Sequence, residues 1–154
     1  MKKYLLILTL VLAGFSSCKK DEKFDAAAQA TKDDTAIQAY LKANPGISAT
    51  KDASGVYYQI ITAGTGNSPV LTSTVNVNYT GSVLGGSTFA TSSNLSSVLS
   101  GLIKGWQVGI PKLKTGGRIL LIIPSALGYG NTSPGAAIPA NSVLIFTIDL
   151  NSFN

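Results

Sequence analysis

The sequence predicts an α+β fold in which an antiparallel sheet curls around one short helix. Two observations support this prediction. Helix-forming residues are mostly confined to the first third of the 154 residues, and the remainder is rich in glycine, serine and threonine. In that remainder, β-branched and aromatic residues recur in short runs separated by glycine-containing turns. The length suits one modest domain with an additional N-terminal segment.

The first residues have the pattern of an export signal. Lys2 and Lys3 precede an apolar run over residues 4–15, which is shorter than the roughly 20 residues that a membrane span requires. Cys18 follows this run and is the one cysteine of the chain, so it has no partner for an internal disulfide. The arrangement resembles a bacterial lipobox. We expect residues 1–17 to be removed as a signal peptide and Cys18 to carry a lipid anchor; an ordinary secretory signal is the alternative.

The segment after Cys18 has little apolar surface to bury. Residues 18–32 are charged or small, which predicts a flexible tether. Within it, Lys20-Asp21-Glu22 resembles the signal that sends lipoproteins of Bacteroidetes to the cell surface. We therefore expect a lipid-anchored protein of the cell envelope, held at the outer membrane and exposed at the surface.

A helical lead-in is predicted over residues 33–53. Its helix is expected at residues 33–43, because acidic residues stand at the start of this segment and Ile37, Tyr40 and Leu41 share one helical face. An Asn-Pro-Gly sequence then ends the helix. We expect the apolar face to pack on the main domain.

The main domain is predicted over residues 54–154. Residues 56–62 are rich in aromatic and β-branched types, which favours a strand. Residues 74–79 alternate apolar side chains with asparagine, so one face of this strand is buried and the other is wet. A glycine-containing turn at residues 84–87 then leads into a strand that begins at residues 88–89.

The second half of this domain is predicted to supply its core. Residues 105–113 are predicted to hold one short helix. Pro111 limits its length, because proline is tolerated in the first turn of a helix only. Residues 118–123 are apolar on both faces, as expected for a central strand that is covered on both sides. Residues 143–150 form the last strand. Between these two strands, residues 125–140 form a long loop, and long loops in compact domains are often functional.

The composition excludes most enzymatic chemistry. The chain has no histidine, and Asp149 is the one acidic residue between Ser54 and Asn154. A serine–histidine triad, a pair of catalytic carboxylates, a zinc site and a hard-cation site are therefore not expected, nor is a metal or other cofactor. The formal net charge of +5 comes from scattered lysines and arginines, so nucleic acid is not an expected partner.

Two kinds of function remain, namely binding in an apolar pocket and catalysis without proton transfer, nucleophile or metal. Rotation about a prolyl peptide bond is a reaction of the second kind. Its barrier of roughly 18–20 kcal/mol arises because amide resonance is lost as the bond twists. Since the planar amide is more polar than the twisted transition state, an apolar pocket that desolvates it lowers this barrier.

Several separated motifs occur in one order in the main domain. They are VNVNYTG at residues 75–81, Phe89, LIKGW at 102–106, Gly116-Gly117-Arg118, ALGYG at 126–130, Ile138-Pro139 and LIF at 144–146. Together they resemble the FKBP-type peptidyl-prolyl cis-trans isomerases, and the IQAYLKAN segment before them is similar to the lead-in of lipoprotein members from Bacteroidetes. The resemblance covers residues 54–154 and implies a bent antiparallel sheet wrapped around one short helix.

The resemblance also implies an aromatic pocket. Trp106 would form its floor, and the hydroxyl of Tyr129 would donate to a substrate carbonyl. A tyrosine between two glycines in a long loop is not placed for packing alone, whereas core packing is the alternative for the strand aromatics. The backbone N–H of Ile103 would also contact the ligand. The implied catalytic residues are Tyr79, Phe89, Trp106, Tyr129 and Phe146, and the implied substrate-binding residues are Leu102, Ile103, Ile138 and Leu95.

The chain departs from the family pattern beside the pocket. Ala90 stands where an aspartate usually follows the pocket phenylalanine. Ser100 and Gly101 precede the LIKGW motif, and Gly101 stands where a polar or acidic side chain is common. The resemblance implies an isomerase of the cell envelope that acts on proline-containing segments of exported proteins and binds macrolide-type inhibitors. The alternative, which Ala90 favours, is a non-catalytic binding module or holdase chaperone for such segments.

Overall fold

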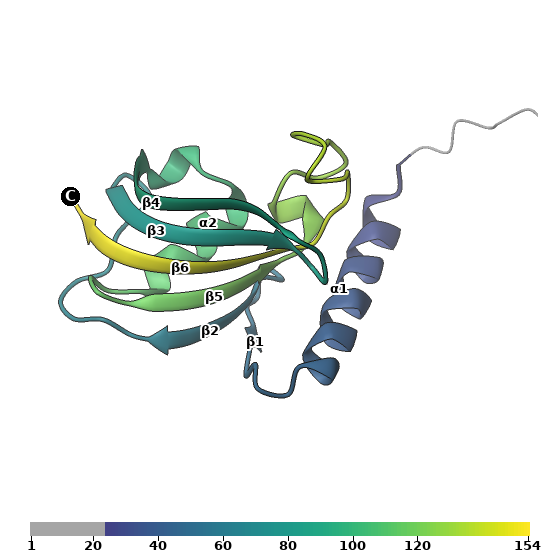
Figure 1. Cartoon of the computed structure of the whole chain (residues 1–154), viewed down its shortest axis with the longest axis horizontal. Coiled ribbons are helices and arrows are strands. Elements are labelled where there is room, and N and C mark those ends of the chain that lie inside the picture. The colour runs from purple at the N-terminus through teal and green to yellow at the C-terminus, as the bar shows by residue number, and fades with distance from the viewer. Residues whose placement is uncertain (1–23) are drawn as a thin grey trace, which may run out of the picture.

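A six-stranded antiparallel sheet curls around the short helix α2, as Figure 1 shows for this computed structural model, which describes residues 24–154. The predicted α+β fold is confirmed. The predicted signal peptide (residues 1–17), Cys18 and the first part of the predicted tether lie outside the described residues. No helix within residues 24–154 is both long and apolar enough to cross a membrane. The main elements are α1 (Ala26–Ala43), β1 (Thr50–Lys51), β2 (Tyr57–Thr62), β3 (Thr74–Val83), β4 (Thr88–Val98), α2 (Lys104–Gly109), β5 (Arg118–Ile123) and β6 (Leu144–Phe153), with single 3₁₀ turns η1 (Leu99–Gly101), η2 (Ile110–Lys112) and η3 (Ser125–Leu127).

Strand β5 lies at the centre of the sheet, whose order is β1-β2-β5-β6-β3-β4. Ile119, Leu121 and Ile123 on one face of β5 are fully buried in the main core together with α2. Ile122 on the other face is fully buried with Ile37 of α1. The two helices thus cover opposite faces of the central strand, which confirms the expectation drawn from its apolar sequence.

Helix α1 begins at Ala26, earlier than the predicted start at Asp33, so residues 26–32 are helical and not part of a flexible tether. The carboxylate of Asp25 caps the helix by accepting two backbone hydrogen bonds from its first turn. The alanine-rich sequence that follows has a high helix propensity. The acidic residues expected at the helix start therefore lie within α1, where they contact the rest of the protein.

Strand β4 runs far beyond residues 88–89, at which its start was predicted. Its further course was not predicted because most of its sequence is serine and threonine without apolar alternation. It forms an outer edge of the sheet and is held by its pairing with β3. Strand β1, in the expected lead-in, also joins the sheet by pairing with β2.

The short helix predicted over residues 105–113 is confirmed but ends earlier. Helix α2 ends at Gly109, and Pro111 lies in the 3₁₀ turn that follows.

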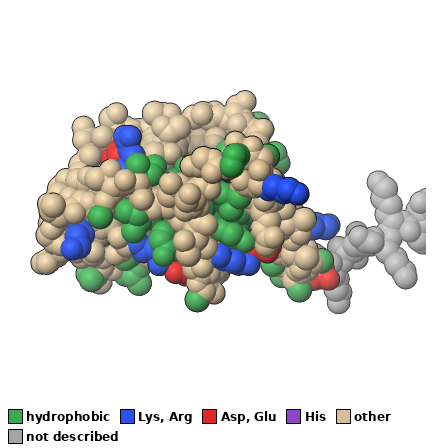
Figure 2. Space-filling model, turned by 90° about the horizontal axis from the view of Figure 1, so that it is seen from below, with side chains coloured by type: hydrophobic (Ala, Val, Ile, Leu, Met, Phe, Trp, Pro, Cys, Tyr) green, Lys and Arg blue, Asp and Glu red, His purple; other side chains and the backbone are tan. Residues whose placement is uncertain are grey.

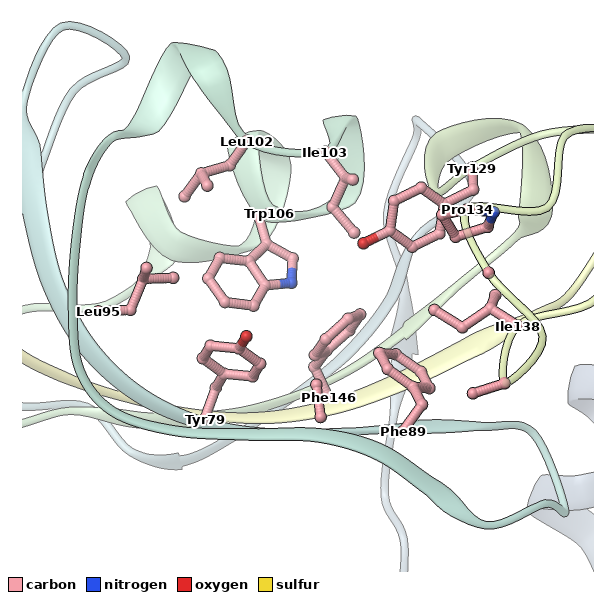
Figure 3. Close-up of a pocket in the computed structure, with 13 residues that line it drawn as sticks. Tyr79, Phe89, Leu95, Leu102, Ile103, Trp106, Tyr129, Pro134, Ile138 and Phe146 are labelled. Carbon is pink, nitrogen blue, oxygen red and sulfur yellow. The ribbon is translucent and has the colours of Figure 1, made fainter.

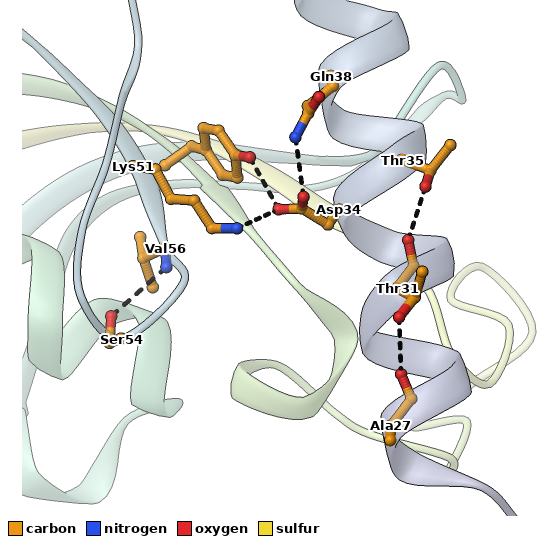
Figure 4. Close-up of polar contacts among 9 residues, drawn as sticks. Ala27, Thr31, Asp34, Thr35, Gln38, Lys51, Ser54 and Val56 are labelled. Carbon is orange, nitrogen blue, oxygen red and sulfur yellow. Dashed lines mark hydrogen bonds and ion pairs between the residues drawn. The ribbon is translucent and has the colours of Figure 1, made fainter.

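The middle of α1 is fixed to β1 and β2 by Asp34 (Figure 4). Its carboxylate accepts hydrogen bonds from the hydroxyl of Tyr57 and the amide of Gln38, at 2.8 Å each, and pairs with the ammonium of Lys51. The Lys51 ammonium, together with the Tyr57 hydroxyl, holds the pKa of the Asp34 carboxyl below its ordinary value. The expectation that this helix packs on the main domain is confirmed.

Two glycines allow α2 to approach β5 closely. A Cβ atom at Gly105 would lie 2.5 Å from side-chain atoms of Ile123, and one at Gly109 would lie 2.5 Å from Leu121. Because these glycines are one helical turn apart, they lie on the same face of α2, and that face has no side chain at either position against the strand. The backbone of α2, and with it the position of Trp106, is set by this contact.

Gly109→Ala is expected to lower the free energy of unfolding by about 1–3 kcal/mol, because its methyl group has no room beside Leu121. Helix propensity alone would favour alanine, so a loss of stability reports the close packing. Urea denaturation checks the value. Gly46→Ala is the control, since a Cβ there would meet nothing within 4 Å. Equal stability of Gly109→Ala and wild type would contradict the packing argument.

Candidate functional site

An apolar cavity of about 330 Å³ opens between the curled sheet, α2 and the loop that follows β5 (Figure 3). Strands β3, β4 and β6 supply one side of the cavity, and the N-terminal end of α2 supplies the other. The loop after η3 closes one end. Its lining residues are Tyr79, Phe89, Ala90, Leu95, Leu102, Ile103, Trp106, Tyr129, Pro134, Gly135, Ala137, Ile138 and Phe146.

Four aromatic rings form the floor and walls in edge-to-face arrangements. The ring centroid of Trp106 lies 5.0 Å from that of Tyr79 and 5.2 Å from that of Phe146, with interplanar angles of 79° and 88°. The rings of Phe89 and Phe146 are 5.7 Å apart at 83°. Such pairs prefer this geometry and hold each other in place. These contacts join the four rings into one packed wall of the cavity.

Trp106 is the floor of the cavity and is 4% exposed. Its indole N–H is buried and has no hydrogen-bond partner among the described residues. The ring is thus positioned by packing and by the approach of α2 to β5. Gly81 of β3 makes space on the opposite side, because a Cβ there would lie 2.5 Å from Phe146 Cε1 and 2.9 Å from Phe89 Cζ.

Besides the Tyr79 hydroxyl, which is directed toward the Trp106 ring in Figure 3, two hydrogen-bond donors lie at the rim of the cavity. Tyr129 is 39% exposed, and Figure 3 shows its hydroxyl directed over the cavity toward Ile103. The backbone N–H of Ile103 takes part in no hydrogen bond among the described residues. Neither donor is taken up by a hydrogen bond within residues 24–154.

The structure brings together all nine pocket residues that the sequence analysis named, while their individual roles stay predictions. It adds three that sequence reasoning missed, namely Pro134, Gly135 and Ala137. These three lie in the long loop that was expected to be functional, but no periodicity or motif identified them. Ala90 also lines the cavity, so the position at which an aspartate was expected contributes no carboxylate.

Apart from the hydroxyls of Tyr79 and Tyr129, the cavity carries no group suited to acid–base, nucleophilic or metal chemistry. None of its lining residues has an imidazole, carboxyl, thiol or amine side chain. In residues 24–154, no three His, Cys, Asp or Glu side chains are grouped so that they could hold a metal ion. On the face shown in Figure 2, Lys and Arg side chains lie apart and form no continuous basic patch. What the site offers chemically is exclusion of water and two oriented donors.

Comparisons with known proteins point to one family. A family model described as FKBP-type peptidyl-prolyl cis-trans isomerase matches residues 66–151. The curated isomerase FkpA of Escherichia coli strain K12 is 42% identical over 103 residues, which cover 64% of this chain and 37% of that protein. The isomerase Mip of Coxiella burnetii is 34% identical over 122 residues, covering 75% of this chain and 52% of that protein. The chain thus spans roughly a third to a half of the length of these relatives.

Solved structures agree with the sequence matches. The crystal structure of FkpA from Escherichia coli superposes with a TM-score of 0.70 at 33% identity, covering 83% of this chain and 64% of that one. A peptidyl-prolyl cis-trans isomerase from Pseudomonas syringae superposes with a TM-score of 0.72 at 28% identity, covering 86% of this chain and 98% of that one. The second match includes nearly the whole of a solved chain.

Proposed function

This chain belongs to the FKBP-type peptidyl-prolyl cis-trans isomerase family, and we propose that its aromatic pocket accelerates rotation about Xaa-Pro bonds in polypeptides. One observation carries the proposal: an apolar cavity with an indole floor has hydrogen-bond donors at its rim and no imidazole, carboxyl, thiol or amine side chain in its lining. Uncatalysed prolyl isomerisation takes about 10–100 s at 25 °C, which is slow enough to limit folding.

The proposed mechanism relies on removing water from the prolyl amide. The planar amide is stabilised by resonance that separates charge, and water favours that polar form. Within the cavity, the faces of Trp106, Phe146 and Phe89 replace water around the proline ring. Because the twisted amide is less polar than the planar one, it loses less hydration free energy on entering the cavity, and the barrier between them falls. The Tyr129 hydroxyl and the Ile103 N–H would each hold a carbonyl of the substrate, which orients the bond that rotates.

The test is the isomerisation rate of an Xaa-Pro peptide with wild type, Phe89→Ala and Tyr129→Phe. We expect the isomerisation rate with the wild-type protein to be clearly higher than the rate in buffer alone. Phe89→Ala opens a wall to water and should lose most of the activity. Tyr129→Phe removes one hydrogen bond of about 0.5–1.5 kcal/mol, so its rate should fall roughly 2–12-fold. Tyr40→Phe on α1 is the matched control and should behave as wild type.

Ala90 favours a second function, a non-catalytic module or holdase that binds proline-containing segments. Its methyl group lines the cavity where the family pattern has a carboxylate. Fluorescence of Trp106 separates the two functions, because a peptide or a macrolide-type inhibitor that fills the cavity should change the emission of the indole. If the peptide binds but its isomerisation rate is no higher than in buffer, the isomerase proposal is overturned and the binding module is favoured.

We also propose that the protein is held at the cell envelope by a lipid on Cys18 and acts there on exported proteins. The support is the sequence alone, namely the basic start, the short apolar run and the cysteine that follows it. Mass spectrometry of the membrane fraction should show a mature terminus at Cys18 with attached acyl chains. An unacylated terminus, or an unchanged membrane fraction for Cys18→Ser, would contradict the anchor.

A further inference from the structure

Two adjacent carboxylates of α1 contact different parts of the protein. Asp34 reaches β1 and β2, whereas Asp33 is directed at Ser125, the first residue of η3. Asp33 is 2% exposed, and its Oδ2 accepts hydrogen bonds from the Ser125 N–H at 2.8 Å and from the Ser125 hydroxyl at 2.7 Å. Its Oδ1 accepts from the amide of Gln29 at 2.7 Å. In Figure 1, α1 passes beside η3 and the loop that follows.

Ser125 in turn holds the backbone on both sides of Tyr129. Its carbonyl oxygen accepts the N–H of Gly128 at 3.0 Å and the N–H of Gly130 at 2.8 Å. The carbonyl of Gly130 accepts the N–H of Asn141 at 2.8 Å, which closes the loop toward β6. The tyrosine at the rim of the pocket is therefore fixed by a short chain of hydrogen bonds that begins at a buried carboxylate outside the pocket.

We propose that Asp33 is a positioning residue for the pocket, which orders the loop of Tyr129 by fixing Ser125. This inference deepens the proposed function and rests on it for its catalytic consequence. Asp33 touches no lining residue in its hydrogen bonds and acts through Ser125. A buried carboxylate is costly unless its oxygens accept hydrogen bonds. Hydrogen bonds to a charged acceptor are stronger than hydrogen bonds between neutral groups. No ion pair satisfies it among the described residues, so the donors of Ser125 and Gln29 do.

The attachment of α1 does not by itself require Asp33. Ile37 is fully buried against β2, β5 and β6, and Asp34 pairs with Lys51 and Tyr57. These contacts hold the helix on the sheet without touching the loop. Loss of Asp33 should therefore loosen the loop while the helix stays docked, and this separates a positioning role from a merely structural one.

The experiment uses the full chain and two readouts for Asp33→Ala, Asp33→Asn and Asp34→Ala. Hydrogen exchange at the amides of Gly128 and Gly130 reports loop order, and kcat/KM on an Xaa-Pro peptide reports its consequence. In Asp33→Ala we expect these two amides to exchange roughly tenfold faster and kcat/KM to fall several-fold. Asp33→Asn keeps an oxygen acceptor for Ser125 but loses the charge, so both readouts should lie between those of wild type and Asp33→Ala. Asp34→Ala, the matched control, should leave both readouts unchanged.

A double variant links the loss of activity to the rim tyrosine. If Asp33 acts through Tyr129, Asp33→Ala should cost less in a Tyr129→Phe background than in wild type, because the hydroxyl that it positions is already absent. Unchanged exchange in Asp33→Ala, or equal acceleration in Asp34→Ala, would overturn the proposal. Should Asp33→Ala fail to fold, Ser125→Ala removes the hydroxyl donor alone and is read at the same amides. A wild-type rate no higher than buffer would refute the proposed function, whereas the exchange result would still decide the positioning role.

Discussion

Replacing Trp106 by alanine is expected to lower kcat/KM on an Xaa-Pro peptide on the order of 100-fold, or about 2.7 kcal/mol of the barrier. The indole forms the floor of the cavity and contacts Tyr79 and Phe146 edge to face. Without it, water reaches the bound amide from below, and two of the remaining rings lose the partner that fixes them. Both effects act against the transition state, because the twisted amide gains from a dry and shaped surface.

The same change is expected to lower stability, since Trp106 is almost fully buried in the main core. Truncating a buried aromatic residue to alanine costs about 3–5 kcal/mol. Kinetics must therefore be measured where urea denaturation shows the variant to be folded. Trp106→Phe is the control, because it keeps an apolar ring at the floor and should lose much less activity. A folded Trp106→Ala with wild-type kcat/KM would show that the cavity floor has no part in turnover.

Gly81→Ala is expected to damage the pocket from the opposite side. The added methyl group would overlap with the rings of Phe146 and Phe89, so one or both walls must move into the cavity. Overpacking of this kind costs about 1–3 kcal/mol of stability. We expect kcat/KM to fall roughly tenfold or more, because misplacement of groups by about 1 Å already has large effects on rate.

The measurements for Gly81→Ala are peptide kinetics and the change in Trp106 fluorescence on ligand binding. Both should be reduced, whereas Gly46→Ala, with open space around its Cβ, should match wild type in both. An unchanged binding isotherm together with unchanged kinetics would mean that the aromatic walls tolerate displacement. The close approach of glycine to these rings would then have no role in the site.

The parts of the fold that local pattern could predict are those in which burial leaves a mark on the sequence. Strand β5 is apolar on both faces and was placed at its exact bounds. Strand β4 is polar along most of its length, because it forms an edge, and nothing in its sequence distinguishes it from a loop. The start of α1 was missed for a related reason, since small exposed residues before Asp33 are compatible with either a helix or a tether.

The pocket was predicted residue by residue through family motifs, since periodicity alone would leave its aromatic residues indistinguishable from core. The role of Asp33 had no such signal. Its partner Ser125 is 92 positions away in the chain, and an acidic residue near a helix start is normally explained by the helix dipole. The loop residues Pro134, Gly135 and Ala137 reach the cavity through the tertiary path of the loop, which no local pattern encodes.

The pH dependence of kcat/KM on an Xaa-Pro peptide distinguishes desolvation from acid–base catalysis in this pocket. Desolvation in a cavity without imidazole, carboxyl, thiol or amine groups requires no proton transfer. We therefore expect a rate above buffer that stays flat between about pH 5 and 8, the range in which catalytic acids and bases usually titrate. A rate equal to buffer, or a bell-shaped or sigmoidal profile in this range, would contradict it.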